Sequence, residues 1–155
     1  MQVETPTRIT HEYEQHIQAS CEDIFPLYCP VRECDWVEGW MPTRVLSASG
    51  VAEDGCVFEM PGESSDSTWV ITEHDDQNLR IAMLKIVPGE LLTRLWIALR
   101  SNGNASVATI RYEYTALNEK GAEFVRNMNA CAYAEFMLEW EGEMNRYLAT
   151  TRGSA

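Results

Sequence analysis

The chain has 155 residues, of which 45% are hydrophobic, and its 12 basic and 24 acidic residues give a net charge of −12. A chain of this length buries roughly 70% of its unfolded surface as one unit, so we expect a single domain over residues 1–155 with an ordered core of about 8–148. The acidic charge opposes binding to nucleic acid, and no stretch approaches the roughly 20 apolar residues that membrane insertion requires.

The five cysteines are odd in number, and no two of them form a CxxC pair. This usage is typical of reduced, mostly buried thiols in a cytoplasmic protein. The N-terminal residues show no basic patch followed by an apolar run, so we expect no secretory signal. The histidines and cysteines lack metal-ligand spacing, and glycine-rich phosphate loops are absent from the sequence, so we expect neither a metal nor a cofactor.

The N-terminal region predicts a long strand followed by two short helices. From Thr7 to Ala19 the residues alternate with the two-residue period of a strand, and one face is wetter than the other. Ser20 stands three residues before Asp23, a spacing that caps a helix start. We expect a short helix directly after this cap. A second one should begin near Pro30 and end at Gly39.

Several further strands are separated by turn residues at intervals of about 8 to 14 residues, the spacing of an antiparallel meander. In the last of these strands Ile110, Tyr112 and Tyr114 share one face, while polar residues share the other. The sheet should therefore have one covered side and one wet side. The strongest strand patterns are at residues 68–74, 79–87, 91–100 and 105–116.

The C-terminal region predicts one uninterrupted helix of about 28 residues after Asn118, whose side chain can cap it. Apolar residues recur there in steps of three and four, which places them on one helical stripe. At 1.5 Å per residue the helix would be roughly 42 Å long, enough to cross the sheet. The stripe comprises Val125, Met128, Ala132, Phe136, Trp140, Met144 and Tyr147.

This order of elements resembles the START/Bet v 1-like helix-grip superfamily, also called SRPBCC or polyketide cyclase/dehydrase-like. Residues 17–27 resemble that family's junction between first strand and first helix, and residues 30–40 are similar to a segment of a bacterial branch of unassigned function. The resemblance implies an α+β fold. One strand, two helices, six strands and one helix would form a curved antiparallel seven-stranded sheet wrapped around the long C-terminal helix.

The resemblance also implies a cavity between the sheet and the C-terminal helix, where relatives hold sterols, lipids, plant hormones or polyketides. Three functions stay open, because one fold can host many. The first is binding of a small hydrophobic ligand, such as a lipid, a polyketide or an aromatic metabolite. The others are a cyclase- or dehydratase-like enzyme with acid/base residues in the cavity, and a protein-interaction module of the chaperone-binding type. An edge strand could also pair two copies in a homodimer.

Two groups of polar residues are candidates for contact with a ligand. His11, Tyr13 and Gln15 share a strand face with apolar residues, so they could orient a ligand, or they could reach solvent if the strand is an edge. Glu33 is close in sequence to two tryptophans, and indole rings that desolvate a carboxylate raise its pKa and suit it to acid/base work. The alternative is an ion pair between Arg32 and Glu33 or Asp35 that holds the helices in place.

An aromatic and methionine set at strand and helix spacing should divide between core packing and the lining of the cavity. Glu33, His11 and Tyr13 are the candidates for proton transfer. The predicted ligand contacts are His11, Tyr13, Trp36, Trp40, Trp69, Met83, Tyr112, Tyr114, Met128, Phe136 and Trp140.

Overall fold

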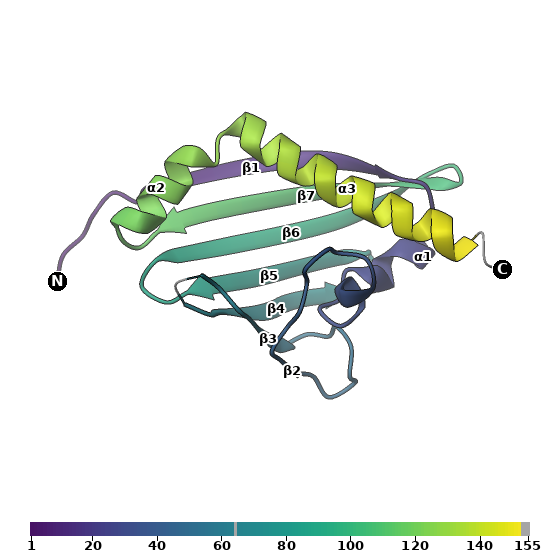
Figure 1. Cartoon of the computed structure of the whole chain (residues 1–155), viewed down its shortest axis with the longest axis horizontal. Coiled ribbons are helices and arrows are strands. Elements are labelled where there is room, and N and C mark those ends of the chain that lie inside the picture. The colour runs from purple at the N-terminus through teal and green to yellow at the C-terminus, as the bar shows by residue number, and fades with distance from the viewer. Residues whose placement is uncertain (64, 153–155) are drawn as a thin grey trace.

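The computed structural model describes residues 1–63 and 65–152, and an antiparallel sheet forms its centre. The sheet has seven strands in the order β1-β7-β6-β5-β4-β3-β2, so the first strand lies beside the last one and the others form a meander (Figure 1). The predicted seven-stranded sheet is confirmed. The strands are β1 (Arg8–Ile17), β2 (Arg44–Leu46), β3 (Val57–Met60), β4 (Ser67–Asp75), β5 (Arg80–Val87), β6 (Leu91–Asn102) and β7 (Ala105–Ala116).

Alternation along the strands decides which side of the sheet is covered. Leu95 and Ile97 in β6 are buried, and so are Ile110 and Tyr112 in β7. Trp96, which lies between Leu95 and Ile97, points to the other face, where two arginine side chains lie over its ring. Because successive side chains of a strand point to opposite faces, one face of the sheet supports the core and the other meets solvent.

Short helical segments connect β1 to β2. The Ser20 hydroxyl accepts a hydrogen bond from the backbone N–H of Asp23 at 3.2 Å, so the predicted cap is confirmed. Gly39 ends the connection with a φ of 75°, in the left-handed region that glycine adopts readily. The segments are the helix α1 (Cys21–Ile24) and the 3-10 helices η1 (Phe25–Leu27) and η2 (Arg32–Asp35).

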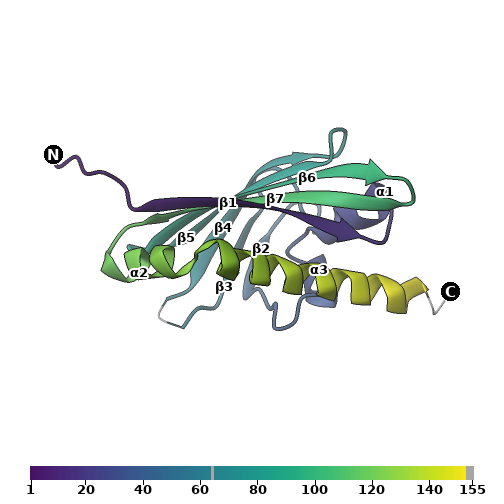
Figure 2. The same cartoon turned by 90° about the horizontal axis from the view of Figure 1, so that it is seen from above.

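The C-terminal region forms two helices, so the prediction of one uninterrupted helix is wrong. α2 (Glu119–Asn127) and α3 (Ala130–Arg152) follow each other along the same face of the sheet (Figures 1 and 2). Met128 leaves the helical conformation with a ψ of 60°, and its carbonyl oxygen lies 2.7 Å from Nε2 of His11. Within residues 1–63 and 65–152, neither helix is long and apolar enough to cross a membrane.

The buried face of the long helix α3 differs in part from the predicted stripe. Phe136, on the predicted stripe, is 39% exposed, whereas Tyr133 and Met137 are fully buried. α3 is a separate helix that begins after the break and packs on β1. Its packing on β1, rather than the direction of α2, therefore sets which of its residues are buried. The buried face of α3 comprises Tyr133, Met137, Trp140, Met144 and Leu148.

Asn129 caps the second helix, and its replacement should weaken the fold. Its side-chain oxygen accepts a hydrogen bond from the backbone N–H of Ala132 at 3.0 Å. We expect Asn129→Ala to lower the free energy of unfolding by about 1 kcal/mol, the usual effect of losing an N-cap. Urea denaturation would measure it, with Asn127→Ala, at the exposed end of α2, as the control. Equal stability of the two variants would contradict a capping role for Asn129.

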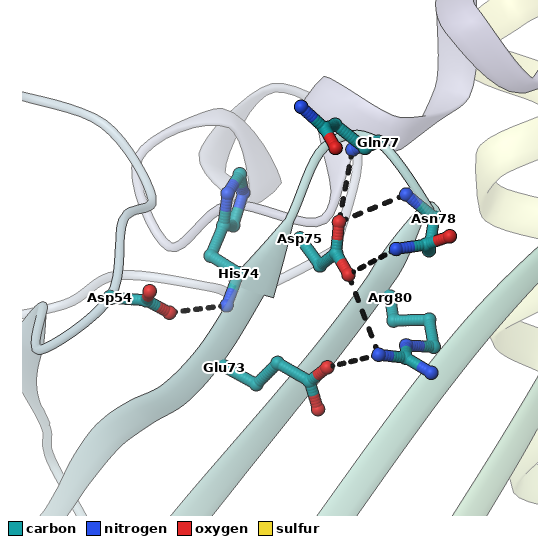
Figure 3. A network of polar contacts seen from close by, with 7 residues as sticks. All are labelled: Asp54, Glu73, His74, Asp75, Gln77, Asn78 and Arg80. Carbon is teal, nitrogen blue, oxygen red and sulfur yellow. Dashed lines mark hydrogen bonds and ion pairs between the residues drawn. The ribbon is translucent and has the colours of Figure 1, made fainter.

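A polar network fixes the turn between β4 and β5 (Figure 3). One carboxylate oxygen of Asp75 accepts hydrogen bonds from the backbone N–H groups of Gln77 at 3.0 Å and Asn78 at 2.9 Å. The other accepts one from the Asn78 side chain, which is the main reason that the pKa of Asp75 lies below its ordinary value. Arg80 bridges Asp75 and Glu73. These acidic residues stabilise a turn, and no three metal-ligating groups in the described part of the chain could hold an ion together.

Candidate ligand-binding cavity

A cavity of about 470 Å³ is bounded by the covered face of the sheet, the two C-terminal helices and the segment around η2. The first part of β6 contributes three alternate residues, Leu91, Thr93 and Leu95, because their side chains point to the same face of the sheet. From α2 comes Phe124, and from α3 come Phe136, Glu139, Trp140 and Glu143. The space that the helix-and-sheet arrangement was predicted to enclose is therefore present.

Aromatic rings packed against one another form much of the cavity wall. Trp69 of β4 stacks on Phe58 at a ring separation of 5.3 Å. Tyr112 of β7 meets the edge of Phe136 on α3 at 5.8 Å, so sheet and helix touch through rings. The Trp140 ring stacks on the Trp36 ring, with the two ring centres 5.6 Å apart. Such contacts restrain each ring, and they give a ligand flat apolar surfaces in fixed positions.

Glu33 is the buried charge-bearing group of the cavity. Its side chain is only 5% exposed, and burial raises its pKa to about 8. It belongs to η2, and its backbone N–H donates to the Cys29 carbonyl at 2.8 Å. Arg32 points outward and pairs with Asp35 at 2.9 Å. Of the two predicted pairings for Arg32, the one with Asp35 is therefore confirmed.

The Glu33 carboxylate itself has neither an ion pair nor a hydrogen bond within residues 1–63 and 65–152. Burial is the sole cause of its raised pKa. A group with that pKa is mostly protonated at neutral pH, because the desolvated charge is unfavourable. Glu33 can thus donate a hydrogen bond as an acid or, once ionised, accept a proton or a positive charge.

The sheet brings one ammonium group to the same cavity. Lys85 of β5 lines it, with Nζ 5.0 Å from the centre of the Trp69 ring. Burial alone lowers the pKa of Lys85, and neither Lys85 nor Glu33 shifts the pKa of the other. The two groups therefore act as separate polar contacts on an otherwise aromatic wall.

No protein-family model and no curated protein matches the sequence, whereas solved structures match its fold. Norcoclaurine synthase from Thalictrum flavum, in complex with dopamine and hydroxybenzaldehyde, has a TM-score of 0.63 at 16% identity over 88% of this chain and 85% of its own. Major latex-like protein 151 from Panax ginseng has a TM-score of 0.63 at 12% identity, over 91% and 97%. An uncharacterized protein from Rhizobium leguminosarum has a TM-score of 0.63 at 11% identity, over 94% and 97%. The chain has the Bet v 1-like helix-grip fold.

The helix-grip cavity is lined by most of the residues predicted as ligand contacts. The shared reason is periodicity: strand residues on the covered face and helix residues on the adjoining side converge on one space. Glu33, the candidate for proton transfer, lines it as well. The predicted contacts found in the lining are Trp40, Trp69, Met83, Tyr112, Tyr114, Met128, Phe136 and Trp140.

His11, Tyr13 and Trp36 lie outside the lining of the helix-grip cavity. The His11 ring stacks on Tyr133 at 5.2 Å and is close to the carbonyl of Met128, so it connects β1 to the helix break. Tyr13 packs against the core from the same edge strand. The Trp36 indole donates to the Leu27 carbonyl at 3.0 Å behind Trp140.

Two side chains on the polar face of β1 form a contact that neither expectation included. Gln15 is buried and donates a hydrogen bond to the carbonyl of Met137 on α3 at 2.9 Å. His11 contacts the carbonyl of Met128 in the same way. α3 packs on this edge strand, and both side chains contact backbone carbonyls of the C-terminal helical region.

Sequence analysis missed several polar groups of the helix-grip cavity. Glu139 and Glu143 lie off the apolar stripe predicted for the helix, so the sequence pattern alone gives no sign that they line a cavity. Lys85 was not singled out, although its position gives a signal. It lies two residues after Met83 in the otherwise apolar stretch of β5, and a two-residue step places both on the same face.

Proposed function

We propose that the protein binds a small hydrophobic ligand in the helix-grip cavity. The observation that carries this proposal is the cavity itself, about 470 Å³ in volume and walled by aromatic and aliphatic side chains with a few polar groups. Small-molecule sites typically have volumes of about 300–1,000 Å³ and the same mixture of apolar walls and sparse polar anchors. The norcoclaurine synthase structure, which has the same fold, holds dopamine and hydroxybenzaldehyde.

Among hydrophobic ligands, the walls favour an aromatic metabolite or a polyketide of similar size. Trp69, Tyr112 and Trp140 present ring faces and edges to the cavity. Offset or edge-on contacts between rings contribute about 0.5–1.5 kcal/mol each beyond the area that they bury. A flat, unsaturated ligand therefore gains more here than a saturated chain of equal volume.

Binding can be tested with N-phenyl-1-naphthylamine, a neutral probe that fluoresces strongly in apolar surroundings. We expect a saturable rise in probe emission and a rise in melting temperature, because a ligand at 100 times its Kd stabilises the folded state by about 2.7 kcal/mol. Thr93→Phe places a ring in the cavity from β6 and should weaken probe binding about tenfold or more. Thr109→Phe adds the same ring on the opposite face of the sheet and serves as the control.

Circular dichroism would establish that both threonine variants keep the fold. Emission that rises linearly without saturation would contradict the proposal. So would equal probe affinities for Thr93→Phe and Thr109→Phe, because the probe would then bind elsewhere on the surface.

One observation favours a second function, acid/base catalysis on a ligand in the cavity. Glu33 is buried, lines the cavity and has a pKa of about 8, near the pH at which a general acid or base works well. A cyclase- or dehydratase-like reaction needs such a group to protonate and deprotonate the folded substrate. For any polyketide or aromatic substrate that the protein converts, Glu33→Gln should reduce turnover by about 100-fold or more. Undiminished turnover in that variant would exclude this role for Glu33.

A further inference from the structure

Carboxylates predominate among the charged side chains of the cavity. Glu33, Glu38, Glu139 and Glu143 line it, against the single cation Lys85 in that lining. The carboxylates come from η2, the loop that follows it and α3, so they gather on the helical side of the cavity, whereas Lys85 comes from the sheet. The helical side therefore has a negative potential that attracts cations and repels anions.

Among these carboxylates, that of Glu33 is the one that is buried and has no hydrogen-bond or ion-pair partner in the described residues. Its side chain is 95% removed from solvent, and in the described residues no donor or cation contacts its carboxylate. The nearby Tyr28 hydroxyl is fully buried and also has no hydrogen-bond partner in the part of the chain that the structure describes. Burial, and next the charge of Glu33, raises the pKa of Tyr28, which shows that the two groups are close.

An unsatisfied buried carboxylate is costly, because it loses hydration without gaining a partner. Most buried polar groups in proteins are hydrogen-bonded, so an exception calls for a reason. Here the carboxylate faces a cavity that is large enough for a ligand, and a ligand can supply the partner that the protein does not.

We propose that the ligand is an aromatic or otherwise apolar amine, and that its ammonium group binds the carboxylate of Glu33. This inference rests on the proposed ligand-binding function and adds the chemical class. A charge-assisted hydrogen bond between ammonium and carboxylate is about twice as strong as a neutral one. Tyr112 and Trp140 line the same cavity, and aromatic rings attract a cation placed over them. The apolar body of the amine would contact Trp69, Met83 and Leu95 on the sheet.

Lys85 does not neutralise Glu33 and so does not substitute for the ligand. The pKa of each group is shifted by burial alone, without a contribution from the other. The Lys85 ammonium lies over the Trp69 ring, and this cation–π contact partly stabilises its positive charge. An anionic ligand would gain one contact at Lys85 but would face the acidic side chains of Glu38, Glu139 and Glu143 on the helical side.

The proposed contact makes binding depend on pH. Glu33 must lose its proton to bind an ammonium group, so affinity should rise with pH up to about 8, by at most tenfold per pH unit. The neighbouring tyrosines keep one charge state in this range, because burial raises the pKa values of Tyr28, Tyr112 and Tyr114. The other titratable groups near Glu33 or in the cavity lining are Cys34, Lys85, Glu38, Glu139 and Glu143.

Three naphthalene probes of matched size test the proposal by isothermal titration calorimetry at pH 7.5. 1-Naphthylmethylamine carries a positive charge, 1-naphthylmethanol is neutral and 1-naphthoate is negative. We expect the amine to bind at least tenfold more tightly than the alcohol, and the naphthoate to bind most weakly. Glu33→Gln should lower the affinity for the amine at least tenfold and flatten its rise between pH 6.5 and 8.

Glu135→Gln is the matched control, because it removes the same charge from an exposed position on α3 outside the cavity lining. It should leave the preference for the amine in place. Equal affinity for amine and alcohol, or a preference for the amine that survives in Glu33→Gln, overturns the inference. Tightest binding of naphthoate overturns it in favour of Lys85. If N-phenyl-1-naphthylamine still binds in these cases, ligand binding stands and only the amine is wrong. If no probe binds, both proposals fail.

Discussion

Replacing Gly121 with alanine should lower the free energy of unfolding by about 2–4 kcal/mol. A β-carbon at this position of α2 would lie 2.0 Å from the carbonyl oxygen of Glu90 and 3.3 Å from the Cα of Ala116. Both obstacles are backbone. The Glu90 carbonyl is also fixed in place by a 2.9 Å hydrogen bond from the backbone N–H of Leu117. The start of α2 must therefore move away from the sheet, at the cost typical of overpacking or more.

Gly142→Ala in α3 provides the matched control for this change. No atom lies within 4 Å of the β-carbon that it would add, and the residue is exposed. Alanine in an exposed helix interior is favoured over glycine, so this variant should gain about 0.5–1 kcal/mol. Chemical denaturation of the two variants would measure opposite shifts. A Gly121→Ala variant as stable as the natural protein would mean that Glu90 and α2 are not in contact as described.

Replacing Glu33 with glutamine should remove a large pH dependence of stability. The pKa of Glu33 is about 8 in the folded protein and about 4.5 as an ordinary glutamate. The folded state thus keeps a proton that the unfolded state releases. Its contribution is fully present below pH 4.5 and is lost as the pH rises through 8. At about 1.4 kcal/mol per pKa unit, the loss is on the order of 5 kcal/mol.

Glutamine has the same shape and cannot ionise, so Glu33→Gln should escape this loss. We expect the variant and the natural protein to have similar stability near pH 5, and the variant to be more stable by several kcal/mol at pH 8.5. Urea denaturation at a series of pH values measures the difference. Glu135→Gln, the same substitution at an exposed site of α3, is the control. Parallel curves for Glu33→Gln and the natural protein would show that Glu33 is ionised in the fold.

The strands were predictable because each one has a single buried face. Alternation and turn residues placed β4 to β7 within two residues of their observed ends. The break in the C-terminal helix was not predictable in the same way, because apolar spacing continues through Met128 and neither Met128 nor Asn129 excludes a helix. The contact that accompanies the break, between His11 and the Met128 carbonyl, joins residues that lie far apart in the sequence.

The cavity was predictable in its aromatic lining and less so in its charges. Residues such as Tyr112 and Trp140 follow strand or helix periodicity, which reports which way a side chain points. Glu139 and Glu143 lie on the flank of α3, where the fold leaves space instead of solvent. A charged residue on a helix flank looks the same in sequence whether it meets bulk water or a cavity. That distinction depends on how far the sheet stands from the helix.

The position of β1 at the edge of the sheet makes completion of the fold depend on the last elements of the domain. β1 pairs with β7, and the backbone N–H of His16 donates to Glu141, 125 positions later in the chain. Closing so long a loop costs entropy before any contact repays it, and folds dominated by distant contacts form slowly. On the ribosome, β1 emerges before β7 and α3 and must wait for both, so the native sheet is completed only once the chain through α3 is available.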